Sequence, residues 1–323
     1  MTTSSLVRAA LVVIAASGCE PLVEVARPVA DARDRDGAMG PWAPVASDTG
    51  SDLYAVWGSG DADVWAVGDN GATVHWNGTR WTAISSGVST RFTGVWAAST
   101  DAAFAVGLDA DVGGTVLRWD GARWSSVQPS MRMRAPLRAL WGRSASDLWL
   151  VGGAVDNPEP AIWRWDGVAW RPDGVVMPRA VALSAVSGNP QDVYAHGPAP
   201  LRRAGGGWSP TPAAPTGATF GTAFCVTPQG VLWVGGVGAV VWRLDGNTWS
   251  SLALPLLNAP KHLFCAGESE VWAVGGGGRV ARWNGAVWSS EDAVRGELNA
   301  LWRGPSGQVW AVGARGIVVR RSS

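Results

Sequence analysis

The chain has 323 residues with 26 basic and 26 acidic side chains, so its formal net charge is zero. That balance excludes a strongly basic nucleic-acid binder and an acidic disordered tail. Hydrophobic residues make up 47% of the chain, enough for a sizeable core, while 22 tryptophans, 43 glycines and a single lysine are untypical of a mostly helical protein.

Residues 1–18 are predicted to be an export signal. Arg8 and the amino terminus supply positive charge, and Ala9 to Ala16 form an apolar stretch that is too short to span a bilayer. The stretch runs into Ser17-Gly18-Cys19. This junction resembles the lipobox of bacterial lipoproteins, in which the cysteine becomes the acylated first residue of the mature chain, although Ala16 stands where leucine is usual.

The resemblance implies a lipid anchor on Cys19, and two or more acyl chains hold a protein stably on a membrane. Glu20 stands where an aspartate would imply retention in the inner membrane, so we expect the outer membrane of a bacterial cell envelope. The alternative is an ordinary signal peptide cleaved nearby, with Cys19 incidental. Residues 19–41 contain three prolines, mixed charges and no aromatic residue, which is typical of a disordered tether.

From Trp42 onward a pattern of about 40 residues recurs seven times. Its most regular feature is an aromatic residue followed three positions later by glycine. The pairs are Trp65/Gly68, Phe104/Gly107, Trp149/Gly152, Tyr194/Gly197, Trp233/Gly236, Trp272/Gly275 and Trp310/Gly313. The short apolar runs around them are rich in β-branched and aromatic residues and lack helical periodicity. We therefore predict that residues 42–323 form an all-β, seven-bladed β-propeller with four antiparallel strands per blade.

Within the first unit, strands A to D are predicted at 54–58, 64–68, 72–76 and 81–85. Strands C and D meet at Asn77-Gly78, a dipeptide that favours a two-residue type I′ hairpin. Such a loop would place Trp76 diagonal to Trp81, and each indole would bury up to ~200 Å². The tryptophans are thus predicted to fill the space between blades rather than to form a binding surface.

The seventh unit has strands A (Leu298–Arg303), B (Val309–Gly313) and C (Ile317–Arg321) but no strand D. Residues 42–45 match a D strand, so we predict that this N-terminal strand completes the last blade. In most units a second aromatic residue, in strand A, lies eight residues before the strand B aromatic residue, as Trp57 does before Trp65. The fourth unit is the weakest, because Val186 takes the place of this strand A aromatic residue.

The turn between strands C and D, an Asp or Asn followed by Gly-x-x-Trp, is similar to the Asp-box of sialidase-like propellers, without the preceding Ser-x-Asp. The sequence pattern formed by residues 64–68 and the turn that follows also resembles that of tectonin-type lectin repeats. Both resemblances cover residues 42–323. The shared motifs specify side-chain packing and turn geometry. The resemblances therefore imply the propeller fold and no particular function.

Three cysteines are an odd number for an exported protein. If Cys19 carries lipid, Cys225 and Cys265 remain, each after a strand A aromatic residue of consecutive units. Phe224 lies nine rather than eight residues before Trp233, which suggests a one-residue insertion. A disulfide between the two cysteines is one interpretation in an oxidising compartment, and two buried free thiols are the other.

The loops between strands B and C and the connections from D to the next A share one face of the predicted ring, and units two and three carry insertions there. The candidate ligand-binding residues are Asp109, Asp111, Asp156 and Glu159 on these insertions, and Arg132 and Arg134 on the connection between the two units. Their carboxylates would accept hydrogen bonds from sugar hydroxyls or bind a cation, and the arginines would bind an anionic group. The alternative is a solvated loop rim without a ligand.

Signs of catalysis are scarce. His75, His196 and His262 occupy different strand positions without metal-ligand spacing, and both tyrosines, Tyr54 and Tyr194, lie in framework strands rather than at a sialidase-like site. We expect no cofactor, no metal and no nucleic acid.

The favoured hypothesis is a monomeric, non-catalytic, lipid-anchored propeller that binds an envelope or extracellular protein through its loop face. One alternative is a lectin-like propeller that binds glycans, which would expose tryptophans in pockets between blades. The other is a glycoside hydrolase or lyase, in which Asp109 or Glu159 would meet a second acid in a deep channel.

Overall fold

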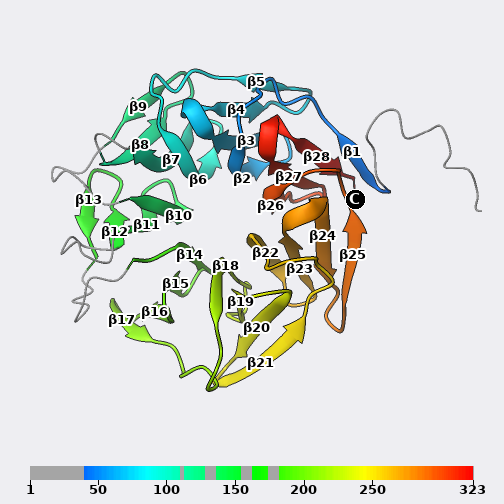
Figure 1. The fold of residues 1–323 in the computed structure, drawn as a ribbon. Coiled ribbons are helices and arrows are strands. Elements are labelled where there is room, and N and C mark those ends of the chain that lie inside the picture. Colours follow the sequence, from blue (N-terminus) through cyan, green and yellow to red (C-terminus); the bar gives the residue numbers. More distant parts are fainter. Residues whose placement is uncertain (1–39, 110–112, 128–135, 154–161, 174–181, 323) are drawn as a thin grey trace, which may run out of the picture. The chain divides into compact units, whose positions relative to one another are not determined.

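The computed structural model describes residues 40–109, 113–127, 136–153, 162–173 and 182–322. They form seven sheets of four antiparallel strands, arranged as the blades of a β-propeller (Figure 1). The innermost strands of successive blades contact one another, and the last contacts the first, which closes the ring. The predicted all-β fold is confirmed.

The strands of each blade run in sequence order from the centre outward. Blade 1 contains β2 (Leu53–Gly60), β3 (Asp63–Gly68), β4 (Thr73–Trp76) and β5 (Trp81–Ala83). Blade 2 contains β6 (Arg91–Ser99), β7 (Ala102–Asp109), β8 (Gly113–Trp119) and β9 (Trp124–Ser126). Blade 3 contains β10 (Leu137–Ser144), β11 (Asp147–Gly152), β12 (Ile162–Trp165) and β13 (Trp170–Pro172). Blade 4 contains β14 (Ala185–Gly188), β15 (Val193–His196), β16 (Pro200–Ala204) and β17 (Gly207–Pro210).

The remaining three blades follow the same order. Blade 5 contains β18 (Phe220–Val226), β19 (Leu232–Gly236), β20 (Val240–Asp245) and β21 (Thr248–Ala253). Blade 6 contains β22 (His262–Gly267), β23 (Glu270–Val274), β24 (Arg279–Trp283) and β25 (Trp288–Asp292). Blade 7 contains β26 (Leu298–Arg303), β27 (Val309–Gly313), β28 (Val318–Arg321) and, as its outermost strand, β1 (Trp42–Pro44).

Strand β1 completes blade 7 as predicted. It pairs antiparallel with β28, with Trp42 opposite Arg321. The Trp42 side chain is buried, donates from Nε1 to Glu291 Oε2 at 3.0 Å, and meets the Trp272 ring edge-on at a centroid distance of 6.5 Å. The N-terminal strand therefore ties blade 7 to blade 6 as well as completing its own sheet.

Tryptophan fills the interfaces between blades. All 22 tryptophans lie in the described residues; 16 are buried, six are partly buried and none is exposed. At most interfaces the strand B aromatic residue of one blade packs against the C and D tryptophans of the next. Trp310, for example, lies 4.8 Å from Trp76 and 5.2 Å from Trp81 between ring centroids. Such clusters bury large apolar areas and add edge-to-face contacts.

An arginine replaces the strand C tryptophan at two interfaces. Arg203 in blade 4 lies over the Trp149 ring of blade 3 and pairs with Asp173 at 2.7 Å. Trp149 Nε1 donates to the same carboxylate at 2.9 Å. Burial opposes ionisation of Asp173, but the hydrogen bonds from Arg203 and the two neighbouring indoles outweigh it and lower its pKa. Arg321 and Glu291 form the corresponding pair between blades 7 and 6.

The turns between strands C and D of blades 1, 2, 3 and 6 differ from the two-residue hairpins predicted. Two-residue loops do join these strands in blades 4 and 5, with Ala204 opposite Gly207 and Asp245 opposite Thr248. Trp76 pairs directly with Trp81 across a four-residue turn. Asn77 Oδ1 accepts hydrogen bonds from the backbone N–H groups of Thr79 at 3.0 Å and Arg80 at 3.1 Å, and only Gly78 has a positive φ, of 94°. The Asn or Asp of this motif is therefore needed for its side-chain oxygen, as in an Asx turn.

The strand register also corrects two predictions. In blade 4, Ser187 rather than Val186 lies opposite the strand B aromatic residue Tyr194. In blade 5, Cys225 lies opposite Trp233, so the insertion predicted after Phe224 is absent and the cysteine itself takes the aromatic position. Blade 4 nevertheless forms a full four-stranded sheet. No helix in the described parts of the chain is long and apolar enough to cross a membrane.

Candidate functional site

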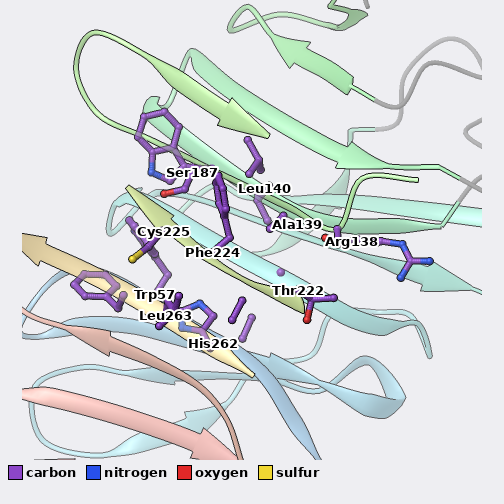
Figure 2. A pocket seen from close by; sticks show the side chains of 18 of the residues that line it. Trp57, Arg138, Ala139, Leu140, Ser187, Thr222, Phe224, Cys225, His262 and Leu263 are labelled. Atoms are coloured by element: carbon purple, nitrogen blue, oxygen red, sulfur yellow. The ribbon is translucent and has the colours of Figure 1, made fainter. Parts of the chain in front are cut away.

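A cavity of about 290 Å³ lies at the centre of the ring, and residues from all seven innermost strands line it (Figure 2). None of its lining residues is an Asp or a Glu. Figure 2 shows Arg138 and Thr222 toward one end of the cavity and Cys225 toward the other. The two ends therefore differ in chemistry.

Seven side chains at corresponding positions surround one end of the cavity. Each lies three residues before the position that pairs with the strand B aromatic residue of its blade. We call these residues the rim: Tyr54, Thr93, Arg138, Ser184, Thr222, Lys261 and Asn299. Because all seven inner strands run in the same direction, the rim lies at the end where the connections from preceding blades arrive.

Two neighbouring rim residues are held by an ion pair and hydrogen bonds. Lys261 Nζ donates to Glu297 Oε2 at 2.7 Å and to Asn299 Oδ1 at 3.2 Å. The hydrogen bond from Lys261 lowers the pKa of Glu297. Asn299 Nδ2 donates in turn to the backbone carbonyl of Leu53 at 2.9 Å, which fixes the amide across the junction of blades 7 and 1. The Lys261 charge is thus balanced within the protein.

Arg138 differs from Lys261, because it has no ion pair or hydrogen bond within the part of the chain that the structure describes. Its side chain is exposed at the start of β10. The rim therefore carries one positive charge that no carboxylate of the described residues balances.

One residue further along each strand, six blades carry a small side chain and the seventh carries a histidine. The small residues are Ala55, Gly94, Ala139, Ala185, Ala223 and Ala300. In blade 6 the position is His262, whose Nδ1 is buried without a hydrogen-bond partner. Burial lowers the pKa of His262 to about 4, so its imidazole is neutral at pH 7. Its other nitrogen, Nε2, has no partner among the described residues, and the side chain lines the cavity.

The opposite end of the cavity is mostly apolar, apart from the hydroxyl of Ser187. Trp57 and Phe264 meet there at a ring-centroid distance of 6.0 Å. A disulfide joins Cys225 of β18 to Cys265 of β22, with their Cα atoms 5.6 Å apart. A disulfide between two residues this far apart in the sequence typically stabilises a fold by about 2–4 kcal/mol. The cysteines do not occupy matching places as predicted, because Cys225 pairs with Trp233 whereas Cys265 pairs with Val271.

The ligand-binding residues predicted on the loops lie almost entirely outside the described residues. Asp109 ends β7 opposite Gly113, and nothing is described of its side chain. Asp111, Arg132, Arg134, Asp156 and Glu159 all fall in the undescribed segments. By their place in the sequence those segments belong to the B–C loops and D–A connections, and the described strand ends that flank them lie at the rim end of the ring.

The other two histidines are held in packing roles. His75 stacks on Trp65 at 4.3 Å and its Nε2 bonds to Asp63 Oδ1 at 2.6 Å, while the Ser59 hydroxyl donates to the same carboxylate. Burial opposes ionisation of Asp63, but these bonds outweigh it and lower its pKa. Since the hydroxyl bonds to the carboxylate and not to the imidazole, the arrangement does not activate a nucleophile. His196 is buried and donates from Nε2 to the Gly221 carbonyl at 2.7 Å.

Sequence reasoning missed the rim and His262, although an alignment of the seven repeats on strand register would have shown one histidine in a column of small residues. No cluster of three or more metal-ligating side chains occurs in the described ranges.

Comparisons with known proteins find the fold in solved structures. No protein-family model matches the chain, and a search of curated proteins finds no match. YCF48 bound to a D1 peptide is similar with a TM-score of 0.69 and 18% identity, over 88% of this chain and 98% of that one. Streptogramin B lyase gives 0.71 and 13% over 86% and 96%, and virginiamycin B lyase from Staphylococcus aureus gives 0.72 and 11% over 86% and 98%. At these identities the likeness shows the seven-bladed propeller fold.

Proposed function

We propose that this chain is a non-catalytic β-propeller of the bacterial cell envelope, anchored through lipid on Cys19, that binds an extended segment of a protein partner at the rim. The observation that carries the proposal is the rim itself: seven mostly polar side chains, one of them the unpaired Arg138, surround a central cavity. YCF48, a neighbour in fold, is known in complex with a D1 peptide, which supports peptide binding by this architecture.

Two observations favour a protein partner over the alternatives. No tryptophan is exposed, so the indoles offer no repeated pockets between blades for sugar rings. The cavity lining contains no Asp or Glu, whereas glycoside hydrolysis requires a pair of carboxyl groups. The Cys225–Cys265 disulfide supports an oxidising, exported location.

A large side chain introduced at the rim tests whether peptides bind there. The full chain, in mild detergent, is applied to an array of overlapping peptides from exported proteins and to a glycan array. We expect a subset of peptides to bind, and Thr222→Trp, which places a large ring on the exposed rim, to abolish that binding. Ser250→Trp, on the exposed outer strand β21, is the matched control. Binding to glycans only, or peptide binding that Thr222→Trp leaves unchanged, contradicts the proposal.

The lipid anchor gives a separate prediction. We expect Cys19→Ser to abolish incorporation of labelled palmitate and to move the chain from the membrane fraction to the soluble fraction, because no acyl chain is then attached. Labelling and fractionation in a bacterial host measure both effects. Cys265→Ser serves as the control and should keep the label. Retention of the label by Cys19→Ser would show that Cys19 is not the lipidated residue.

A further inference from the structure

The rim end of the cavity carries a hydroxyl group and one unbalanced cation that the described residues leave without partners. Thr222 contributes a hydroxyl group and Arg138 a guanidinium group, both without a partner in the described residues. The hydroxyls of Thr93 and Ser184 already donate to the backbone carbonyls of Leu137, at 2.9 Å, and His196, at 3.2 Å. With no carboxylate in the lining, an oxygen-rich anion would complement this end of the cavity.

The tautomer of His262 adds a donor to this set. Among backbone groups, a buried N–H without an acceptor is rarer than a buried C=O without a donor, and we infer the same preference for the two imidazole nitrogens. Since Nδ1 is buried and unpartnered, the neutral ring is best placed with its proton on Nε2. Nε2–H is then free to donate into the cavity. His262 follows the rim position of its own strand by one residue, a step of about 3.3 Å along the strand.

The size and lining of the cavity indicate whether it would bind the end of a peptide or an internal segment of one. Its volume of about 290 Å³ is at the lower end of the range of ligand pockets, about 300–1,000 Å³. Trp57, Phe264 and the disulfide line the far end. A cavity this small would hold only the last one or two residues of a chain that inserts from the rim, and its far end would offer a mostly apolar surface to the final side chain.

We propose that the central cavity binds the C-terminal carboxylate of a peptide that ends in an apolar residue. Arg138 forms the ion pair with the carboxylate, and His262 Nε2 donates a hydrogen bond to the same terminal residue. This inference rests on the proposed peptide binding and specifies which part of the partner is recognised.

The test uses pairs of ligands that differ only at the terminus. N-acetyl-leucine is compared with N-acetyl-leucinamide, and each peptide selected on the array is compared as free acid and as amide, by calorimetric titration of the full chain. We expect the acids to bind at least about tenfold more tightly, as is typical of hydrogen bonds to a charged group. Arg138→Gln should remove most of that preference, and Arg171→Gln, on the exposed outer strand β13, should not.

His262→Ala separates binding from folding. Alanine stands at the same position in five other blades, so this variant should keep its thermal stability while its affinity for the acids falls about tenfold. The ring signals of His262 in NMR spectra should shift when the acids are added and not when the amides are added.

The outcomes distinguish this inference from the proposed function. If peptides bind equally well as acid and amide, or if the acid preference survives both Arg138→Gln and His262→Ala, the carboxylate site is wrong and peptide binding stands. If N-acetyl-leucine binds and shifts the His262 signals but no peptide binds, the carboxylate site stands and the proposed function is wrong.

Discussion

Replacement of Trp310 by alanine is expected to lower the free energy of unfolding by about 3–5 kcal/mol, the usual cost of removing a large buried aromatic side chain. Trp310 is completely buried and packs against Trp76 and Trp81 of the next blade. Its loss leaves a cavity between blades 7 and 1, where the ring closes. Urea unfolding followed by tryptophan fluorescence or circular dichroism measures the change.

Trp310→Phe is the informative control for this prediction. Trp310 Nε1 is buried without a partner, and blade 2 carries Phe104 at the same position. Phenylalanine therefore removes an unsatisfied donor and keeps most of the packing, so we expect a loss below about 1.5 kcal/mol. Trp149→Phe should cost more, because the Trp149 indole donates to Asp173. Equal losses for Trp310→Ala and Trp310→Phe would contradict the packing role.

Replacement of Trp42 by alanine is expected to open blade 7 at its outer strand. The substitution removes a buried indole, its contact with Trp272 and its hydrogen bond to Glu291, at a cost of about 3–5 kcal/mol. With β1 held only by short backbone pairing, β28 becomes an exposed sheet edge that can pair with other chains. We expect faster hydrogen exchange along β28 and aggregation at temperatures where the wild-type chain stays soluble.

Ala43→Thr provides the matched control for the β1 prediction. Ala43 lies in the same strand but is exposed, and threonine favours extended backbone. This variant should leave hydrogen exchange and aggregation unchanged. Unaltered exchange along β28 in Trp42→Ala would mean that β1 does not hold the blade closed.

The fold was predictable because its repeated residues have strict physical roles. Gly68, three residues after Trp65, shows why: a Cβ atom there would lie 1.8 Å from the backbone oxygen of Asp52. Gly313 meets Glu297 in the same way, at 1.8 Å. Only glycine allows so close an approach between strand B and the connection into the blade, which accounts for the aromatic–glycine spacing in five repeats. At Gly236 and Gly275 a Cβ atom would meet nothing closer than 3.1 Å, so this contact does not explain the glycine in blades 5 and 6.

The register of blades 4 and 5 could not be read from the aromatic residues. Ser187 and Cys225 occupy positions that are aromatic in the other blades, so counting from Val186 and Phe224 placed both strands one residue out of register. The prediction of a two-residue turn at Asn77 was wrong for another reason. Asn-Gly suits both a two-residue hairpin and a four-residue Asx turn, and the direct pairing of Trp76 with Trp81 selects the second.

The candidate site was hidden because its residues are unlike one another and distant in sequence. Arg138 and His262 belong to different repeats and resemble no known motif, and only the closed ring places both on one cavity. The loop residues that the sequence favoured remain a prediction. The described strand ends that flank them lie at the rim end of the ring, and Arg132 and Arg134 shortly precede the strand of Arg138 in the sequence.

Blade 7 combines the first described strand with the last three, whereas each of the other six blades consists of strands consecutive along the chain. Neighbouring strands can therefore form hairpins as they are synthesised, but β1 has no partner until the residues of β28 have been made. Pairings between distant parts of a chain form slowly. We expect closure of blade 7 to be the last step of folding, so that a chain interrupted before Val318 remains an open arc and a target for proteases.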